Sequence, residues 1–231
     1  MAVFTIGDLH LSLGADKKMD IFPGWENYVE RLERHWREAV SDGDTVVVAG
    51  DLSWGMTLDG ALMDLQFLDR LPGRKLLVKG NHDYWWATAA KMQDFFSRHG
   101  LLSLSLLHNN ACPCGGMALC GSRGWLFEKG EAHDRKILLR EAMRLQLSLQ
   151  EGEKYPGEKV AFLHYPPVYG GEVSGEILEV LHRFGVRRCY YGHIHSAGCA
   201  RAVCGEFDGI RFQLVSADFL RFRPLLVEET V

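Results

Sequence analysis

The sequence lacks the long apolar runs that place a protein in a membrane. Its apolar stretches are short and are broken by charges or glycines, so we expect no transmembrane helix. Residues 1–7 are apolar, but no basic segment precedes them, and Asp8 and His10 follow directly. This pattern is typical of a strand and not of a secretion signal, so we expect a cytoplasmic protein.

Paired cysteines and an excess of positive charge are also missing. The six cysteines do not form the two Cys-x-x-Cys pairs of a structural zinc site, and reduced apolar cysteines are the simpler interpretation. The glycine-rich stretch 170–175 has no Lys-Ser/Thr pair of a nucleotide P-loop. A net charge of −4 argues against stable binding to duplex nucleic acid, but it allows a small anionic substrate held by local cations.

What the chain does contain is typical of one globular domain. It has 231 residues, of which 47% are hydrophobic and 24% charged, enough for a large core. No linker, repeat or low-complexity segment interrupts it. We therefore expect a single domain over residues 1–231.

Strands and helices alternate along the first hundred residues. Short β-branched runs predict strands, and apolar positions at helical spacing predict the helices between them. The expected order is strand 2–7, helix 25–40, strand 45–49, helix 58–69, strand 75–79 and helix 84–98. Such alternation predicts a parallel sheet with right-handed crossovers.

The second half of the chain begins with shorter strands. The expected elements are strands 101–107, 109–112 and 116–121, helix 132–150, strand 159–163, helix 175–184 and strand 188–191. For the tail, 197–227, we expect two or three antiparallel strands separated by Gly205 and by Asp208-Gly209.

Polar side chains follow five of the predicted strands, at the point where each strand ends. They comprise two carboxylates, one amide and five imidazoles: Asp8, His10, Asp51, Asn81, His82, His164, His193 and His195. Parallel strands place such loops on one edge of a sheet, where ligands bind. Each histidine alone could be structural, but together they predict a site for Mn²⁺, Fe²⁺ or Fe³⁺, Co²⁺ or Zn²⁺.

Eight polar side chains exceed what one ion requires. A pair of ions about 3.5–4 Å apart, as in two-metal hydrolases, would use them. A carboxylate must then bridge the pair, because only a two-oxygen anion can hold both cations efficiently. Asp51 is central in the order of the motifs and is the candidate bridge.

The ordered motifs resemble the metallophosphoesterase (calcineurin-like phosphoesterase) superfamily, in particular a bacterial group of predicted phosphohydrolases. All five blocks of that superfamily are present in order: Gly7-Asp8-Leu9-His10, Gly50-Asp51, Gly80-Asn81-His82-Asp83, His164 and Gly192-His193-Ile194-His195. The resemblance implies an α/β fold, a four-layer α/β/β/α sandwich of two mixed sheets that is metallo-dependent phosphatase-like.

The resemblance also implies a role for each motif residue. The first metal would be held by Asp8, His10, Asp51 and His195, and the second by Asp51, Asn81, His164 and His193. His82 would be the general acid, and Asp83 would orient its imidazole or cap the next helix. A metal-bound hydroxide, formed at neutral pH, would attack phosphorus in line.

Charge narrows the expected substrate. Two divalent ions carry four positive charges, and Asp8, Asp51 and a bridging hydroxide remove three, so a phosphodiester monoanion balances the remainder. No arginine stands in the Gly50-Asp51 or Gly80-Asn81-His82 stretches, unlike the protein phosphatases of the superfamily. Arg123 is the candidate phosphate clamp, with a surface ion pair as its alternative.

Tryptophans follow several of the motif loops. Trp54, Trp85 and Trp125 are candidates for stacking a ring of the substrate, although at least one of Trp85 and Trp86 is expected in the core. The sequence therefore favours a dinuclear metal-dependent hydrolase of a small phosphorylated substrate, with a preference for a phosphodiester or nucleotide-like compound. The alternatives are a small-molecule phosphomonoesterase and a non-catalytic metal-binding interaction scaffold.

Overall fold

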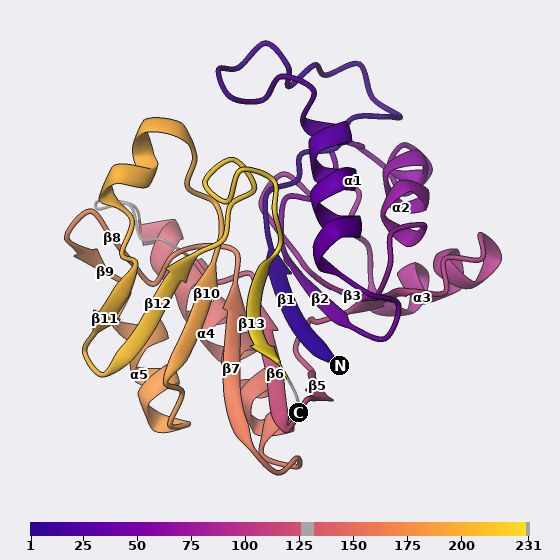
Figure 1. The fold of residues 1–231 in the computed structure, drawn as a ribbon. Coiled ribbons are helices and arrows are strands. Elements are labelled where there is room, and N and C mark those ends of the chain that lie inside the picture. Colours follow the sequence, from indigo (N-terminus) through magenta and orange to yellow (C-terminus); the bar gives the residue numbers. More distant parts are fainter. Residues whose placement is uncertain (126–131, 230–231) are drawn as a thin grey trace.

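The computed structural model describes residues 1–125 and 132–229, which form two mixed sheets (Figure 1). The first sheet contains, in order, β13 (Leu225–Glu229), β1 (Ala2–Ile6), β2 (Thr45–Ala49), β3 (Arg74–Val78) and β4 (Leu104–Leu106). Strands β1 to β4 are parallel, and β13 is antiparallel to β1. The predicted parallel arrangement of the first three strands is confirmed.

The second sheet is parallel in its centre and antiparallel at both edges. Its order is β11 (Gly205–Phe207), β12 (Ile210–Leu214), β10 (Arg188–Tyr191), β7 (Glu158–Leu163), β6 (Met117–Ser122) and β5 (Ala111–Cys114). A small hairpin of β8 (Val168–Tyr169) and β9 (Glu172–Val173) lies apart from it.

The tail does not form the predicted group of antiparallel strands. It starts with a 3₁₀ helix, η1 (Ser196–Arg201), and β12 pairs parallel with β10, while β13 joins the first sheet. The only local hairpin in the described part of the tail is β11–β12, whose turn residues Asp208 and Gly209 both have positive φ, as its tight turn requires. The predicted turn at Asp208-Gly209 is therefore present, whereas the pairing of β12 with β10 and of β13 with β1 was not predicted.

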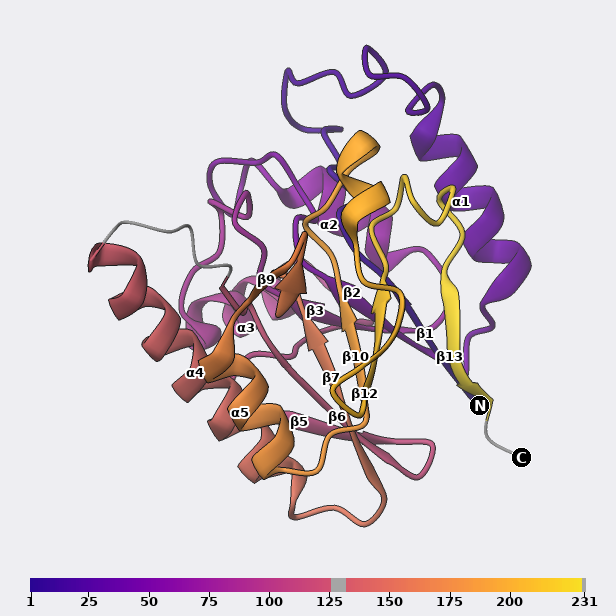
Figure 2. The ribbon, with the colours of Figure 1, turned by 90° about the vertical axis from the view of Figure 1, so that its left-hand side faces the viewer.

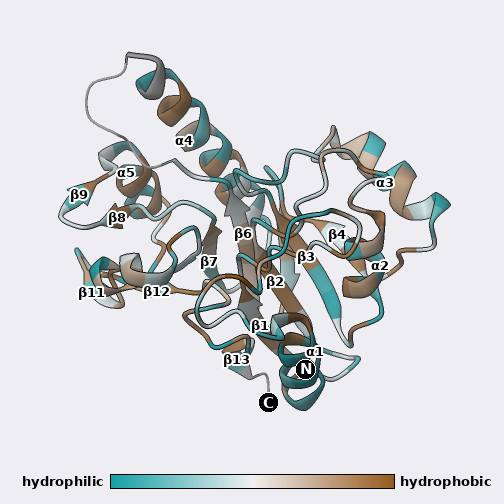
Figure 3. Ribbon diagram, turned by 90° about the horizontal axis from the view of Figure 1, so that it is seen from above, coloured by the Kyte–Doolittle hydropathy of each residue, from teal (hydrophilic) through white to brown (hydrophobic). Residues whose placement is uncertain are grey.

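Helices cover the outer face of each sheet. Helices α1 (Tyr28–Ala39), α2 (Leu62–Asp69) and α3 (Ala89–Arg98) pack on the first sheet, and α4 (Ala132–Gly152) and α5 (Gly175–Arg183) pack on the second (Figures 1 and 2). Viewed from above, the strands lie between these two groups of helices (Figure 3). A third core joins the two sheets, and its fully buried members include Val47, Leu119 and Phe162. The predicted four-layer α/β/β/α sandwich is confirmed.

Three helices begin later than their apolar spacing predicted. Trp25 and Trp85 are each 2% exposed, but both lie in loops, before α1 and α3 respectively. Helix α3 starts after Thr88, whose hydroxyl accepts a hydrogen bond from Lys91 N. None of the helices in the described ranges has the length and apolar composition needed to cross a bilayer.

Candidate metal centre

The loops after five parallel strands meet at the carboxyl edge of the two sheets, which lies at the top in Figure 1. Each predicted donor lies in one of these loops or at the end of its strand: Asp8 and His10 after β1, Asp51 after β2, Asn81 after β3, His164 after β7, and His193 and His195 after β10. The structure therefore brings together all seven residues that the sequence nominated as metal ligands.

A first group of donors consists of Asp8, His10 and His195, whose ligand atoms lie within 4.8 Å of one another. The Nε2 atoms of His10 and His195 face each other at 3.3 Å. Asp8 Oδ1 lies 3.3 Å from His195 Nε2, and Asp51 Oδ2 lies 3.8 Å from His10 Nε2. Four side chains thus aim a nitrogen or oxygen atom at one point.

A second group lies beside the first and consists of Asp8, Asp51 and His164. Asp51 Oδ1 is 3.6 Å from His164 Nε2. Asn81 Oδ1 is 2.6 Å from the same nitrogen and 3.0 Å from His193 Nδ1. The two oxygen atoms of Asp51 therefore face different groups of donors.

The local backbone of the site is unusual. Asp8, His10, Asp51 and His193 all have positive φ, between 46° and 73°, a region that side chains other than glycine rarely adopt. Such conformations persist where the surrounding structure enforces them, and they concentrate at functional sites. They turn each side chain inward immediately after its strand.

Two motif glycines make room for the carboxylates. A methyl group on Gly80 would overlap Asp51 Oδ1, and one on Gly192 would overlap Asp8 Oδ2. Close approach, and not chain flexibility, therefore explains glycine at these two positions.

The second nitrogen of two imidazoles is already held in place. His164 Nδ1 lies 3.1 Å from the Ala49 carbonyl oxygen, and His195 Nδ1 lies 3.0 Å from Asp218 Oδ1. Such partners fix the ring and leave Nε2 for a metal, as is usual for metal-binding histidines. Sequence reasoning missed Asp218, which follows β12, because the tail was expected to form antiparallel strands away from the site.

Burial and mutual repulsion dominate the electrostatics. Burial, and then the charge of Asp8, raises the pKa of Asp51, while burial lowers the pKa of His10 and of His193 to about 3. Burial alone would lower the pKa of His195, but Asp8 and Asp218 raise it to about 10. Two buried carboxylates face one protonated imidazole, His195, and neutral imidazoles at His10 and His193, so further positive charge would stabilise them. The donor set, which has no thiol, thus fits divalent cations.

His82 stands at the rim of the centre. Its backbone N–H donates to Asp51 Oδ1 at 2.8 Å, and its ring centroid lies 4.6 Å from that of Trp54. Its Nδ1 is buried without a hydrogen-bond partner among the described residues. Burial, followed by the positive charge of Lys17, lowers the pKa of His82.

Asp83 does not orient the His82 imidazole, contrary to the prediction, and α3 begins too late for it to act as a helix cap. Its carboxylate, 1% exposed, accepts backbone N–H bonds from Asp51 (3.0 Å), Leu52 (2.9 Å) and Gly80 (2.7 Å), and a bond from Trp85 Nε1 (3.1 Å). Asp83 therefore ties the loops after β2 and β3 together. With the longer bond from Ser53 N (3.4 Å), four backbone N–H groups and one indole N–H point at this carboxylate, and they take the place of the His82 imidazole.

Above the donors lies a pocket of about 300 Å³. It is lined by His10, Lys17, Met19, Phe22, Trp25, Trp54, His82, His195 and Ser196. Trp54 thus lies where the sequence placed it, beside His82 and stacked on His10 with centroids 4.9 Å apart. Lys17, which belongs to none of the motifs, is an unexpected member.

The other substrate-binding candidates lie elsewhere. Arg123 Nη2 is 3.2 Å from Oε1 of the fully buried Glu141, so the ion-pair alternative is present, although it is buried and not on the surface. Trp85 belongs to the core and bonds to Asp83, which corrects its assignment to substrate binding. Trp125 packs against Tyr165 (5.0 Å), which in turn packs against His193 (4.2 Å), so a ring separates Trp125 from the donors.

A family model described as calcineurin-like phosphoesterase matches residues 1–197. The chain therefore belongs to the calcineurin-like phosphoesterase family, a class of metal-dependent phosphoester hydrolases, as its motifs indicated. Among curated proteins, the gene 66 protein of Mycobacterium phage L5 is 36% identical over 83 residues, which are 33% of this chain and 37% of that protein. The match thus spans well under half the length of this relative.

Solved structures of low identity share the fold. A phosphopantetheinyl hydrolase from Mycobacterium tuberculosis aligns with a TM-score of 0.57 and 15% identity, covering 100% of this chain and 97% of that one. A protein of unknown function from Aquifex aeolicus aligns with a TM-score of 0.54 and 15% identity, covering 97% and 95%. At this identity the likeness supports the architecture alone.

Proposed function

We propose that the protein is a dinuclear metal-dependent hydrolase of small phosphate esters. The observation that carries the proposal is the position of Asp51 between two groups of donors, with Oδ2 3.8 Å from His10 Nε2 and Oδ1 3.6 Å from His164 Nε2. A bridging carboxylate must present one oxygen to each ion.

Each ion would have a separate set of ligands. Asp8, His10, Asp51 and His195 would hold one, and Asp51, Asn81, His164 and His193 would hold the other. When bound, such ions lower the pKa of water and stabilise the charge that builds on phosphate oxygens. Mn²⁺, iron, Co²⁺ and Zn²⁺ all suit the mixed nitrogen and oxygen donors.

His82 would donate a proton to the leaving group. Its ring lines the pocket, and its Nδ1 is buried, so a substrate oxygen would be reached by the other ring nitrogen, Nε2. Histidine is suited to proton transfer near neutral pH, and such transfer contributes about 10²–10⁴-fold to rate. The imidazole would act beside Asn81 without being a metal ligand.

An interaction scaffold without catalysis is the rival function. Every donor position of the five motif blocks is filled, and an open pocket of about 300 Å³ leads to them. A scaffold requires neither feature. A volume of about 300 Å³ is at the small end of ligand pockets, which supports a small phosphorylated substrate.

The test compares Asp51→Asn with His82→Ala. Both variants should lose at least about 100-fold in hydrolysis of an aryl phosphate ester. Bound metal, measured by elemental analysis, should fall strongly in Asp51→Asn and stay unchanged in His82→Ala. Asp59→Asn, an exposed carboxylate outside the site, is the matched control for both readouts.

Two results would contradict the proposal. Equal metal loss in both variants would mean that His82 and Asp51 do not have separate roles. Full metal content in Asp51→Asn would remove the bridge on which the dinuclear arrangement depends.

A further inference from the structure

The loop 12–27 forms a wall over the candidate metal centre, where it rises above the sheets in Figures 1 and 2. Long loops within compact domains are commonly functional. This one is held firmly: Leu13 N donates to Asp64 Oδ1 at 2.7 Å, and Trp54 Nε1 donates to Met19 Sδ at 3.3 Å. Trp25, which is 2% exposed, packs against Phe222 with ring centroids 5.1 Å apart.

Lys17 is the cation that this wall presents to the pocket. Its Nζ lies 2.9 Å from the centroid of the Trp54 ring, and both residues line the same pocket as His82. Among the residues whose side chains the structure describes, no carboxylate forms an ion pair with Lys17. The partner of its charge in this part of the chain is the face of Trp54, a weak partner that a phosphate oxygen would readily replace.

The arginines near the site already form ion pairs with a buried glutamate. Arg123 is bound to the buried Glu141, which also accepts from Arg144 at 2.8 Å. Neither guanidinium lines the pocket over the donors. Lys17 is therefore the cation of the described structure that is placed to receive a substrate phosphate there.

We infer that Lys17 binds the phosphate group of a phosphomonoester dianion, and that its departure from Trp54 frees that ring to stack on a flat aromatic leaving group. The inference rests on the proposed function. With both ions bound, the charge that remains balances a monoanion, and the ammonium of Lys17 adds the positive charge that a dianion needs. The charge count made from the sequence favoured a phosphodiester because it included no cation beside the metal ions. Lys17 supplies that cation.

The shape of the pocket fits such a leaving group. Its walls are largely aromatic and apolar, with Trp25, Trp54, Met19 and Phe22 around the ammonium. A volume of about 300 Å³ is at the small end of ligand pockets, which suits one or two rings and not a polymer. Aryl phosphates have this chemistry, and so do nucleoside monophosphates, in which the leaving sugar alcohol carries a flat base.

The first experiment compares a monoester with a diester that share one leaving group, p-nitrophenyl phosphate and bis(p-nitrophenyl) phosphate. Lys17→Met should lower kcat/KM for the monoester by about 10–100-fold, the range for a lost charge-assisted hydrogen bond, and for the diester by less than about threefold. Lys17→Arg should retain most of the activity. Lys18→Met, which alters the exposed neighbour outside the pocket, is the control and should match the wild type.

Equal losses on both esters, or no loss on either, would overturn the role of Lys17. The role of the ring is tested separately with Trp54→Leu and Trp54→Tyr. Trp54→Leu should lower the ratio of kcat/KM for the aryl monoester over glycerol phosphate by about tenfold, and Trp54→Tyr should preserve that ratio. An unchanged ratio in Trp54→Leu would overturn the stacking.

Binding of inorganic phosphate provides a readout that does not depend on turnover. In calorimetry with metal-loaded protein, Lys17→Met should weaken phosphate binding by about tenfold or more, while Lys18→Met should not. If the wild type hydrolyses neither ester, the proposed function fails. The role of Lys17 is then still decided by phosphate binding, since unchanged affinity in Lys17→Met would overturn it.

Discussion

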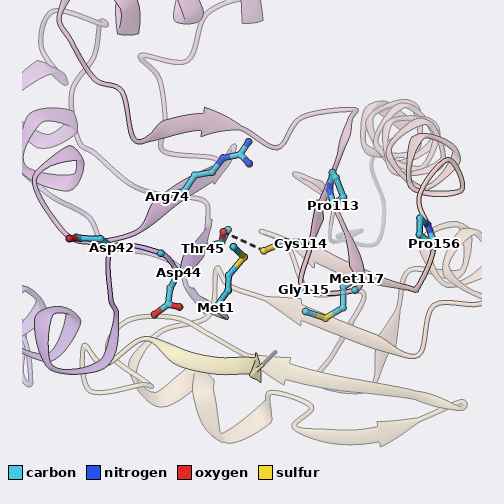
Figure 4. A pocket seen from close by; sticks show the side chains of 12 residues that line it. Met1, Asp42, Asp44, Thr45, Arg74, Pro113, Cys114, Gly115, Met117 and Pro156 are labelled. Atoms are coloured by element: carbon cyan, nitrogen blue, oxygen red, sulfur yellow. Dashed lines mark hydrogen bonds between the residues drawn. The ribbon is translucent and has the colours of Figure 1, made fainter. Parts of the chain in front are cut away.

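The two ends of the sheets differ in what their buried polar atoms do. The amino ends of β2, β3 and β6 border a pocket of about 480 Å³, larger than the one over the candidate metal centre (Figure 4). Its lining includes Asp42, Asp44, Arg74 and Cys114. A further pocket of about 500 Å³ lies beside Lys79 and His108. Size alone would therefore not have identified the pocket over the candidate metal centre.

The polar atoms at the amino ends are occupied by the backbone. Asp44 accepts from Ala2 N at 2.6 Å and from Ser41 N at 2.9 Å. Lys75, which is fully buried, donates to the carbonyls of Asp69 and Leu71 and to the Ser103 hydroxyl.

At the carboxyl ends, in contrast, ring nitrogens face one another or a carboxylate, as the 3.3 Å between the Nε2 atoms of His10 and His195 shows. Such atoms gain a good partner only when a cation enters between them. The kind of partner, and not cavity volume, therefore distinguishes the two ends: side-chain donors face one another at the carboxyl ends, and backbone groups occupy the polar atoms at the amino ends.

The largest effect on stability should come from loss of Asp83 at the carboxyl end. Loss of Asp44 at the amino end is the comparison and should have a much smaller effect. Asp83→Ala removes a buried acceptor of several N–H groups, so it should lower the free energy of unfolding by about 3–5 kcal/mol. Asp44→Ala removes two partly exposed bonds and should lower it by only about 1 kcal/mol. Urea denaturation of the metal-free proteins measures both.

Hydrolysis should separate the same two variants. Asp44→Ala should keep the activity of the wild type, because the amino ends take no part in it. Asp83→Ala should lose activity, because the loops after β2 and β3 carry Asp51 and Asn81. Similar stability losses in the two variants would remove the contrast between the ends.

Much of this contrast could be predicted from the sequence. Strands β2 and β10 have the predicted bounds, and the ligand candidates follow their strands at once. Parallel strands bring the candidates of each sheet together, and the packing of the two sheets joins both groups. The sequence could not separate buried loop tryptophans from helix positions, because Trp25 and Trp85 continue the apolar spacing of the helices after them.

Residues placed by tertiary packing were beyond sequence reasoning. Asp218 reaches His195 only because β12 pairs parallel with β10, and Lys17 reaches the pocket only because loop 12–27 is tied to Asp64 and Trp54. Neither residue belongs to a motif. Asp83 stood within a motif, but its role depended on which amides surround it.

A smaller effect, on metal affinity and hydrolysis, should follow from loss of Asp218. This change tests whether a carboxylate that contacts only one metal-binding histidine also matters at the carboxyl end. Asp218→Ala frees the Nδ1 of His195 and should lower metal affinity or hydrolysis by about 10–100-fold, as for other partners of metal-binding histidines. Titration with Mn²⁺ followed by activity measures both. The effect should be smaller than that of Asp51→Asn, since His195 itself remains.

The chain offers a matched control for that change. Asp208 Oδ2 lies 2.9 Å from His182 Nε2 in an exposed pair far from any motif residue in sequence. Asp208→Ala should leave metal affinity unchanged. Comparable losses in Asp208→Ala and Asp218→Ala would show that Asp218 acts on overall stability and not on His195.

The smallest effect concerns Lys75 at the amino end, where a cation and not an anion is buried. Burial lowers the pKa of Lys75 from 10.5 to about 8. Between pH 8 and 10.5 the unfolded chain binds more protons than the folded one, so this residue makes the folded state more stable as pH rises. The gain should reach about 2 kcal/mol over that interval.

Lys75→Met isolates this contribution, because the variant has no group that titrates there. Its carbonyl partners lose a donor, which lowers stability at every pH, but the difference between wild type and variant should grow from pH 8 to 10.5. Urea denaturation at fixed metal concentration measures that difference. A difference in stability that stays constant with pH would mean that the carbonyls of Asp69 and Leu71 keep the ammonium fully charged. The amino end would then tolerate a buried charge through backbone bonds alone, whereas the carboxyl end requires counter-ions.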